Sequence, residues 1–228
     1  MGCTWCDAAY TWAVTAEKAA KTRSGQRYER NEPAYGEKEM EPAEVLSRLR
    51  KLWDVEDRPT TIVVSGGEPM MQRRALVPLL EQLCSCGNEI HIETAGTIAP
   101  LAEFDALVTQ DNVSPELATS GNRLSKRIKP DELASLVATD RAWFKFVITD
   151  AWEADLAEVD HLVLEAALPR RRVVVMPEGS DSQTNIGTAR KVADPALERG
   201  YGLASGVTCS SGTATPTVTE AFRVESVG

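Results

Sequence analysis

The stretch Thr60-Thr-Ile-Val-Val-Ser-Gly-Gly-Glu-Pro69 indicates the class of fold. Its first half is a short run of β-branched residues, which predicts a strand buried on both faces of a parallel sheet. The strand ends at Gly66 and Gly67, and two glycines allow a loop backbone to approach a ligand closely. Glu68 follows them, and its carboxylate could accept hydrogen bonds from an ammonium group. The stretch therefore predicts a strand that delivers a ligand-binding loop, with a plain tight turn as the alternative.

Outward from this stretch, strand patterns and helix patterns alternate along the chain. The predicted strands begin near residues 61, 89, 106, 143 and 172, and the third of them covers residues 106–109. The predicted helices cover residues 42–53, 76–83, 131–139 and 150–158. Pro78 fits the second helix only if it lies in the first turn. Strands that alternate with helices predict an α/β fold with a parallel sheet.

The composition limits the classes of protein to which the chain could belong. With 228 residues and 43% hydrophobic content, it can bury one substantial core. A formal net charge of -9 argues against binding a nucleic-acid backbone, which is done by clustered Lys and Arg. No apolar run approaches the roughly 20 residues of a membrane span, and no secretory leader is visible, so we expect a cytoplasmic protein without a membrane partner.

The segment Cys3-Thr-Trp-Cys-Asp7 places two thiols three residues apart beside an aromatic side chain. Thiolates this close can share one soft metal centre or one redox bond, and short-spaced cysteines hold 4Fe-4S clusters in proteins. A zinc half-site, a thioredoxin-like pair and simple burial of two apolar thiols are the alternatives. Five cysteines, an odd number, fit metal ligation better than a disulfide framework.

Together with Tyr10-Thr-Trp12 and Ser65–Pro69, the cysteine segment resembles the radical S-adenosylmethionine enzymes, and within them the 7-carboxy-7-deazaguanine synthases. The resemblance implies a partial (β/α)6 barrel with the site at the carboxyl ends of its strands. It also implies a 4Fe-4S cluster held by three cysteines, of which Cys3 and Cys6 match the second and third. The first would lie upstream of Met1, so we expect a chain truncated before its first strand, which binds the cluster poorly as it stands.

The resemblance also assigns ligand contacts to particular residues. The implied cofactor-binding residues, which would contact S-adenosylmethionine, are Trp5, Asp7, Gly66, Gly67, Glu68, Ser114, Pro115 and Glu116. Ser65 is implied to touch the substrate, and no catalytic side chain is assigned. Glu116 replaces a lysine of the family pattern, so we expect contacts from the main chain rather than from this side chain.

Two further segments carry weaker signals. Glu93-Thr-Ala-Gly-Thr97 follows a predicted strand and resembles a loop of the same family, but a strand-to-loop turn with Gly96 at positive φ explains it equally well. Lys145 lies in an apolar strand, where an unpaired buried charge is unfavourable. We therefore expect its side chain to reach a pocket or the rim of the barrel.

The family resemblance also implies Mg2+ beside the substrate carboxylate. In the family a threonine hydroxyl belongs to this metal site, whereas the chain has Ala8 at that position. Because magnesium takes an octahedral shell of oxygen ligands, we expect weaker magnesium dependence or a different metal contact.

The function implied by the resemblance is conversion of 6-carboxy-5,6,7,8-tetrahydropterin to 7-carboxy-7-deazaguanine with loss of ammonia, in queuosine (7-deazapurine) biosynthesis. The implied partners are this pterin, an electron donor such as flavodoxin or ferredoxin, and a second copy in a homodimer. An activating enzyme for a glycyl-radical protein and an inactive remnant without its cluster are the alternatives. We expect a core over residues 1–201 and a disordered, low-complexity tail over residues 202–228, because that tail is rich in Ser, Thr and Gly.

Overall fold

The computed structural model of the chain describes residues 2–4, 9–22, 25–29, 38–52, 60–178, 182–204 and 222–224. Its main sheet has six strands in the order β2-β3-β4-β5-β6-β7, which is also their order along the chain. The strands are β2 (Thr61–Val64), β3 (Glu89–Thr94), β4 (Gln110–Val113), β5 (Ala142–Ile148), β6 (Val173–Pro177) and β7 (Gly202–Leu203). The pairs β2–β3, β5–β6 and β6–β7 are parallel. The predicted parallel α/β fold is thus confirmed. The predicted burial of the first strand is wrong: β2 lies at the edge of the sheet, and none of its four residues is buried.

The chain forms two compact units, and each is described by itself. The N-terminal unit contains residues 2–94, 98–112 and 220–228, and the C-terminal unit contains residues 95–97 and 113–219. Each unit has its own cluster of buried apolar side chains.

In the N-terminal unit, helix α3 covers strand β3 with a row of leucines. The helices of this unit are η1 (Ala9–Thr11), α1 (Ala16–Ala19), α2 (Pro42–Leu52), η2 (Pro69–Gln72), α3 (Arg73–Ser85) and α4 (Ala102–Asp105). Leu76, Leu79, Leu80 and Leu83 of α3 are buried in one cluster with Ile90 and Ile92 of β3. A separate two-stranded parallel sheet pairs β1 (Lys38–Met40) with β8 (Phe222–Val224).

Pro78 lies inside α3 rather than in its first turn, so that part of the prediction is wrong. The helix begins at Arg73, because the preceding 3-10 turn η2 leads directly into it and the Arg73 amide donates to the Met70 carbonyl. A proline in this interior position removes one helical hydrogen bond. The buried leucine row supplies the tertiary packing that offsets this loss.

The strand predicted at residues 106–109 is also wrong, since β4 covers Gln110–Val113. The amides of residues 106–108 donate to carbonyls of the short helix α4 or the turn that closes it. They are therefore unavailable for strand pairing. Pairing starts with Thr109, whose amide donates to the Ile90 carbonyl at 2.8 Å.

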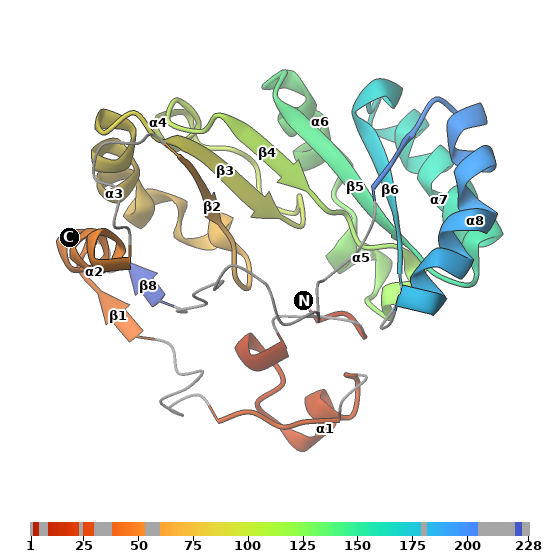
Figure 1. Ribbon diagram of the computed structural model, residues 1–228, viewed down its shortest axis with the longest axis horizontal. Helices are drawn as coiled ribbons and strands as arrows, with labels where there is room; N and C mark the ends of the chain where they lie inside the picture. The colour runs from red at the N-terminus through yellow and green to blue at the C-terminus, as the bar shows by residue number, and fades with distance from the viewer. Residues whose placement is uncertain are drawn as a thin grey trace. The chain divides into compact units, whose positions relative to one another are not determined.

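In the C-terminal unit, two long helices cover the central strands. The helices are η3 (Ala118–Ser120), α5 (Leu124–Arg127), α6 (Pro130–Ala138), α7 (Trp152–Glu165), η4 (Arg170–Arg172) and α8 (Ser182–Glu198). Figure 1 shows α7 and α8 side by side, and they pack on β5 and β6 respectively. Phe144 and Phe146 of β5 and Val173 and Val175 of β6 point into this core, because alternate residues of a strand face the same side.

Tyr201 closes the core of the C-terminal unit, immediately before β7. Its ring is 2% exposed, its hydroxyl donates to Asp160 Oδ1 at 2.7 Å, and the Arg170 guanidinium lies over the ring. The expected tail, residues 202–228, therefore begins with strand β7, which pairs with β6. The division into a core and a tail remains a prediction, since residues 205–221 and 225–228 lie outside the described residues.

The Tyr201 hydroxyl should make the stability of the fold fall at alkaline pH. Burial, followed by the hydrogen bond and the charge of Asp160, raises the pKa of Tyr201 above its ordinary value of about 10. The folded state then keeps the proton that the unfolded chain loses, so the free energy of unfolding should decrease as pH rises above about 10. We expect urea unfolding between pH 8 and 11 to show a smaller decrease for Tyr201→Phe. Parallel pH profiles for the two proteins would contradict this assignment.

Among the described residues, no helix is both long and apolar enough to cross a membrane.

Candidate functional site

The glycine loop of the N-terminal unit lies directly after β2. Ser65, Gly66 and Gly67 are exposed, and Gly66 has a φ of +132°, a conformation that favours glycine. A side-chain carbon at Gly66 would meet no atom within 4 Å. The conformation therefore requires this glycine, and the space above the loop is open among the described residues.

Glu68 is held in place by two donors from its own unit. Its Oε1 accepts a hydrogen bond from the Met70 amide at 3.2 Å, which caps η2, and another from the Thr94 hydroxyl at 2.8 Å. Thr94 is the last residue of β3 and is buried. The carboxylate thus connects the carboxyl ends of β2 and β3, which is the edge where parallel α/β sheets bind ligands. Both donors orient the side chain, so a ligand would meet a preorganised carboxylate.

Gly96 explains the shape of the Glu93–Thr97 segment without any ligand. Its φ is +70°, and a side-chain carbon there would lie 2.6 Å from Val113 Cγ1 and 2.8 Å from Leu133 Cδ2. Both neighbours are fully buried in the core of the C-terminal unit. The positive φ expected at Gly96 is therefore confirmed, and a ligand contact of this segment remains a prediction.

The cysteines of the described residues do not form a metal site by themselves. Cys3 is buried, while Cys6 lies outside the described residues, as do Trp5, Asp7 and Ala8. Within the part that the structure describes, no three His, Cys, Asp or Glu side chains come together as metal ligands. Burial raises the pKa of the Cys84 thiol, whose Sγ donates to the Leu107 carbonyl at 3.5 Å. This geometry supports a packing role for Cys84.

In β3, β4 and β5, exposed or half-buried polar side chains alternate with buried residues. In the N-terminal unit, Gln110 Nε2 donates to Asn112 Oδ1 at 2.7 Å, and His91 Nε2 lies 4.0 Å from Glu89 Oε2. In the C-terminal unit, Lys145 is half-buried on a strand whose alternate residues, including Phe144, enter the core. Sequence reasoning missed the Gln110–Asn112 pair because the predicted strand ended at residue 109.

The segment Ser114–Thr119, here called the post-β4 segment, contains the other predicted ligand contacts. Ser114 and Glu116 are half-buried, whereas Pro115 is buried. The Glu116 carbonyl accepts a hydrogen bond from Arg127 Nη1 at 2.9 Å. The backbone of this segment is therefore fixed from the side of α5.

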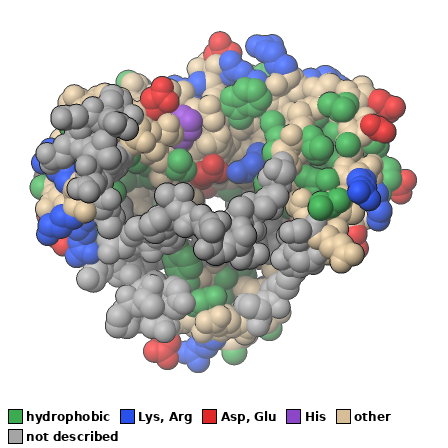
Figure 2. Space-filling view, viewed as in Figure 1, with side chains coloured by type: hydrophobic (Ala, Val, Ile, Leu, Met, Phe, Trp, Pro, Cys, Tyr) green, Lys and Arg blue, Asp and Glu red, His purple; other side chains and the backbone are tan. Residues whose placement is uncertain are grey.

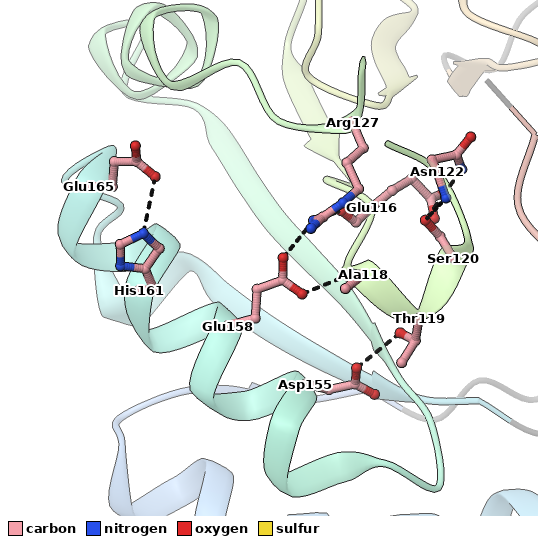
Figure 3. A network of polar contacts seen from close by, with 10 residues as sticks. All are labelled: Glu116, Ala118, Thr119, Ser120, Asn122, Arg127, Asp155, Glu158, His161 and Glu165. Atoms are coloured by element: carbon pink, nitrogen blue, oxygen red, sulfur yellow. Dashed lines mark hydrogen bonds and ion pairs between the residues drawn. The ribbon is translucent and has the colours of Figure 1, made fainter. Parts of the chain in front are cut away.

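Helix α7 holds the same segment through two acidic side chains (Figure 3). Glu158 Oε2 accepts from the Ala118 amide at 2.8 Å, and its Oε1 lies 2.6 Å from Arg127 Nη1. One turn earlier, Asp155 Oδ1 accepts from the Thr119 hydroxyl at 2.9 Å. These side chains were missed in the sequence because 36 to 40 positions separate the helix from the residues it holds.

Charged side chains of both signs are mixed over the face shown in Figure 2. On that face, the described residues include no continuous basic surface of the kind that grips a phosphate backbone.

The structure therefore places the predicted residues in two groups. Ser65, Gly66, Gly67 and Glu68 form one loop of the N-terminal unit, and Ser114, Pro115 and Glu116 form one segment of the C-terminal unit. Their contacts with ligands remain predictions.

Comparison with curated proteins finds relatives that share the name 7-carboxy-7-deazaguanine synthase. The chain is 29% identical to that of Pyrobaculum aerophilum over 200 residues, 87% of this chain and 75% of the relative. It is 29% identical to that of Hyperthermus butylicus over 177 residues, 78% of this chain and 64% of the relative. It is 35% identical to that of Rhodopirellula baltica over 153 residues, 61% of this chain and 56% of the relative. The chain thus spans less than two thirds of the second and third of these relatives.

A solved structure, QueE from Escherichia coli, shares the fold. It matches with a TM-score of 0.55 and 20% identity, over 90% of this chain and 79% of that one. No protein-family profile matches the chain.

Proposed function

We propose that this chain converts 6-carboxy-5,6,7,8-tetrahydropterin to 7-carboxy-7-deazaguanine with loss of ammonia. The premise is that it is a relative of the 7-carboxy-7-deazaguanine synthases within the radical S-adenosylmethionine superfamily. The observation that carries the proposal is the loop after β2, where Glu68 is held at the carboxyl edge of the sheet by Met70 and Thr94. A fixed carboxylate beside exposed glycine backbone suits the ammonium group of S-adenosylmethionine.

In this proposal the chain binds S-adenosylmethionine through two segments. Glu68 accepts the ammonium group, with Gly66 and Gly67 presenting their backbone to it. The post-β4 segment contributes main-chain groups of Ser114, Pro115 and Glu116. Trp5 stacks on the adenine, a role that a planar aromatic side chain can perform. Asp7 is a further contact, and Ser65 touches the pterin.

The proposed reaction is tested most directly by product formation. The protein, prepared anaerobically with iron and sulfide, would be incubated with dithionite, S-adenosylmethionine and 6-carboxy-5,6,7,8-tetrahydropterin. We expect 7-carboxy-7-deazaguanine by mass spectrometry. Formation of 5'-deoxyadenosine without that product would support the assignment to the superfamily but contradict the proposed substrate.

Glu68→Gln should weaken binding of S-adenosylmethionine while leaving the fold intact. The glutamine side chain keeps one oxygen for the Met70 amide and the Thr94 hydroxyl, but it removes the negative charge. We expect a loss of about 1.5 to 3 kcal/mol in binding free energy, the range for hydrogen bonds to charged groups. Calorimetric titration would measure it, with the exposed Glu81→Gln in α3 as a control. Unchanged affinity would mean that this loop is a plain turn and does not bind the ammonium group.

The donor chemistry for a 4Fe-4S cluster is present in part. Cys3 is buried and Cys6 is three residues away, so two thiolates of suitable spacing could ligate iron. When bound, the cluster would supply the electron that cleaves S-adenosylmethionine. The role of the protein is to hold the sulfonium and the pterin in line and to exclude water.

Loss of Cys3 or Cys6 should remove the iron that the chain retains after anaerobic reconstitution. Cys3→Ala and Cys6→Ala should each lower the ratio of iron to protein and the absorbance near 400 nm, because thiolates hold the cluster. Cys84→Ala and Cys86→Ala, which lie at the end of α3, should leave both quantities unchanged. Equal iron content in all four variants would exclude Cys3 and Cys6 as ligands.

The residues present fit magnesium less well. Ala8 offers no oxygen ligand where the family pattern has a hydroxyl, and magnesium requires oxygen donors. No step of the proposed reaction is therefore assigned to Mg2+. An electron donor such as flavodoxin or ferredoxin, a homodimer and a cytoplasmic location remain predictions.

A further inference from the structure

The ion pair between the buried Arg127 and the half-buried Glu158 contacts both sides of one short piece of backbone. Arg127 Nη1 donates to the Glu116 carbonyl at 2.9 Å, and Glu158 Oε2 accepts from the Ala118 amide at 2.8 Å. Between these two groups lies Leu117, which is 1% exposed and belongs to the core. The pair thus fixes the orientation of the peptide groups on either side of a buried anchor.

The pair comes from elements that do not adjoin the segment in sequence. Arg127 is the last residue of α5, and Glu158 lies in the middle of α7 (Figure 3). Arg127 Nη1 lies 2.6 Å from Glu158 Oε1, so each charge neutralises the other while holding its own backbone partner. A movement of either side chain would therefore be transmitted to the post-β4 segment.

Stability alone is a poor explanation for this arginine. Its side chain is 6% exposed, and its Nε is buried without a hydrogen-bond partner among the described residues. A buried ion pair often contributes no more to stability than apolar side chains of the same volume, because the charges lose their hydration. Its directed hydrogen bonds, by contrast, specify one backbone conformation.

We propose that Arg127 and Glu158 are positioning residues for S-adenosylmethionine: they hold the main chain of Ser114–Glu116 in the conformation that contacts this ligand, without touching it themselves. The inference rests on the proposed function, which assigns those contacts to the post-β4 segment. The new element is that affinity for S-adenosylmethionine depends on an ion pair that does not itself contact the ligand. In this inference Arg127 holds the backbone of Glu116 through the Glu116 carbonyl. The Glu116 side chain is not needed for this role.

The test separates positioning from stability with a paired replacement. Arg127→Met alone leaves Glu158 without its counter-charge and should lower the melting temperature. The double variant Arg127→Met with Glu158→Leu removes both charges and should recover most of that loss. We expect its dissociation constant for S-adenosylmethionine, measured by calorimetry, to stay about 10- to 100-fold above that of the unaltered protein, as for a misplaced binding group.

Two further measurements make the result specific. Arg199→Met breaks another ion pair of α7, in which Arg199 Nε lies 2.9 Å from Asp160 Oδ2, and it should leave the affinity unchanged. Hydrogen exchange should become faster at the Ala118 amide in the double variant, because that amide loses its acceptor, and should stay slow in β5.

The outcomes distinguish this inference from the proposal on which it rests. If the unaltered protein binds S-adenosylmethionine and the double variant binds it equally well, the positioning role is overturned and the proposed function stands. If the unaltered protein binds no S-adenosylmethionine, both fall. Weak binding by a stable double variant, with normal binding by Arg199→Met, supports the inference.

Discussion

Gly96→Ala is expected to destabilise the fold by about 2 to 5 kcal/mol. A residue with a side chain in the left-handed region costs about 1 to 2 kcal/mol, and Gly96 has a φ of +70°. Overpacking a well-filled core adds about 1 to 3 kcal/mol, because the new carbon would lie 2.6 Å from Val113 Cγ1 and 2.8 Å from Leu133 Cδ2. Val113 is β-branched and fully buried, so it cannot turn away easily.

Gly200→Ala is the matched control for this prediction. Gly200 belongs to the same unit and has a φ of +77°, but a side-chain carbon there would meet only Arg170 Cβ, at 3.9 Å. It should therefore show the conformational cost without the clash. Urea unfolding followed by circular dichroism would compare the two variants, and equal losses would mean that the core accommodates the Gly96 methyl group.

The strands that could be predicted are those in which local preference and tertiary role agree. The runs Thr61–Val64, Ala142–Ile148 and Val173–Pro177 are rich in β-branched and aromatic residues, which favour strands. The last two have buried alternate residues, whereas Thr61–Val64 is an edge strand in which no residue is buried. β4 has the opposite character, with Gln, Asp and Asn in a row. Its neighbours in the sheet impose the strand there, and no periodicity of its own indicates it.

The two parts of the candidate site also differ in whether the local sequence indicates them. The loop at Ser65–Glu68 could be predicted because glycines after an apolar run mark a backbone conformation locally. The partner of Glu68, Thr94, lies 26 positions away and is set by the pairing of β2 with β3. Arg127 and Glu158 lack any local signal, since a charged residue in a helical pattern is usually solvated. Their contacts with the post-β4 segment become visible only in the folded structure.

Removal of the Asp155 carboxylate is the second change expected to have a large effect. Asp155 is 1% exposed and lies in the first turn of α7, where the helix dipole favours a negative charge. Its Oδ2 accepts from the Thr149 amide and hydroxyl, both at 2.7 Å, and its Oδ1 accepts from the Thr119 hydroxyl at 2.9 Å. One carboxylate therefore holds both the end of β5 and the post-β4 segment.

Asp155→Ala should lower the free energy of unfolding by about 3 to 5 kcal/mol, because it leaves the buried Thr149 amide and two hydroxyl groups without their acceptor. Asp155→Asn keeps one oxygen, so it should lose less. Asp150→Ala is the control: Asp150 is exposed in the turn before α7, and a surface change of this kind should stay within about 0.5 kcal/mol. Urea unfolding would rank the three variants. If Asp155→Ala were as stable as Asp150→Ala, water would be able to replace the carboxylate, and the post-β4 segment would depend on Glu158 and Arg127 alone.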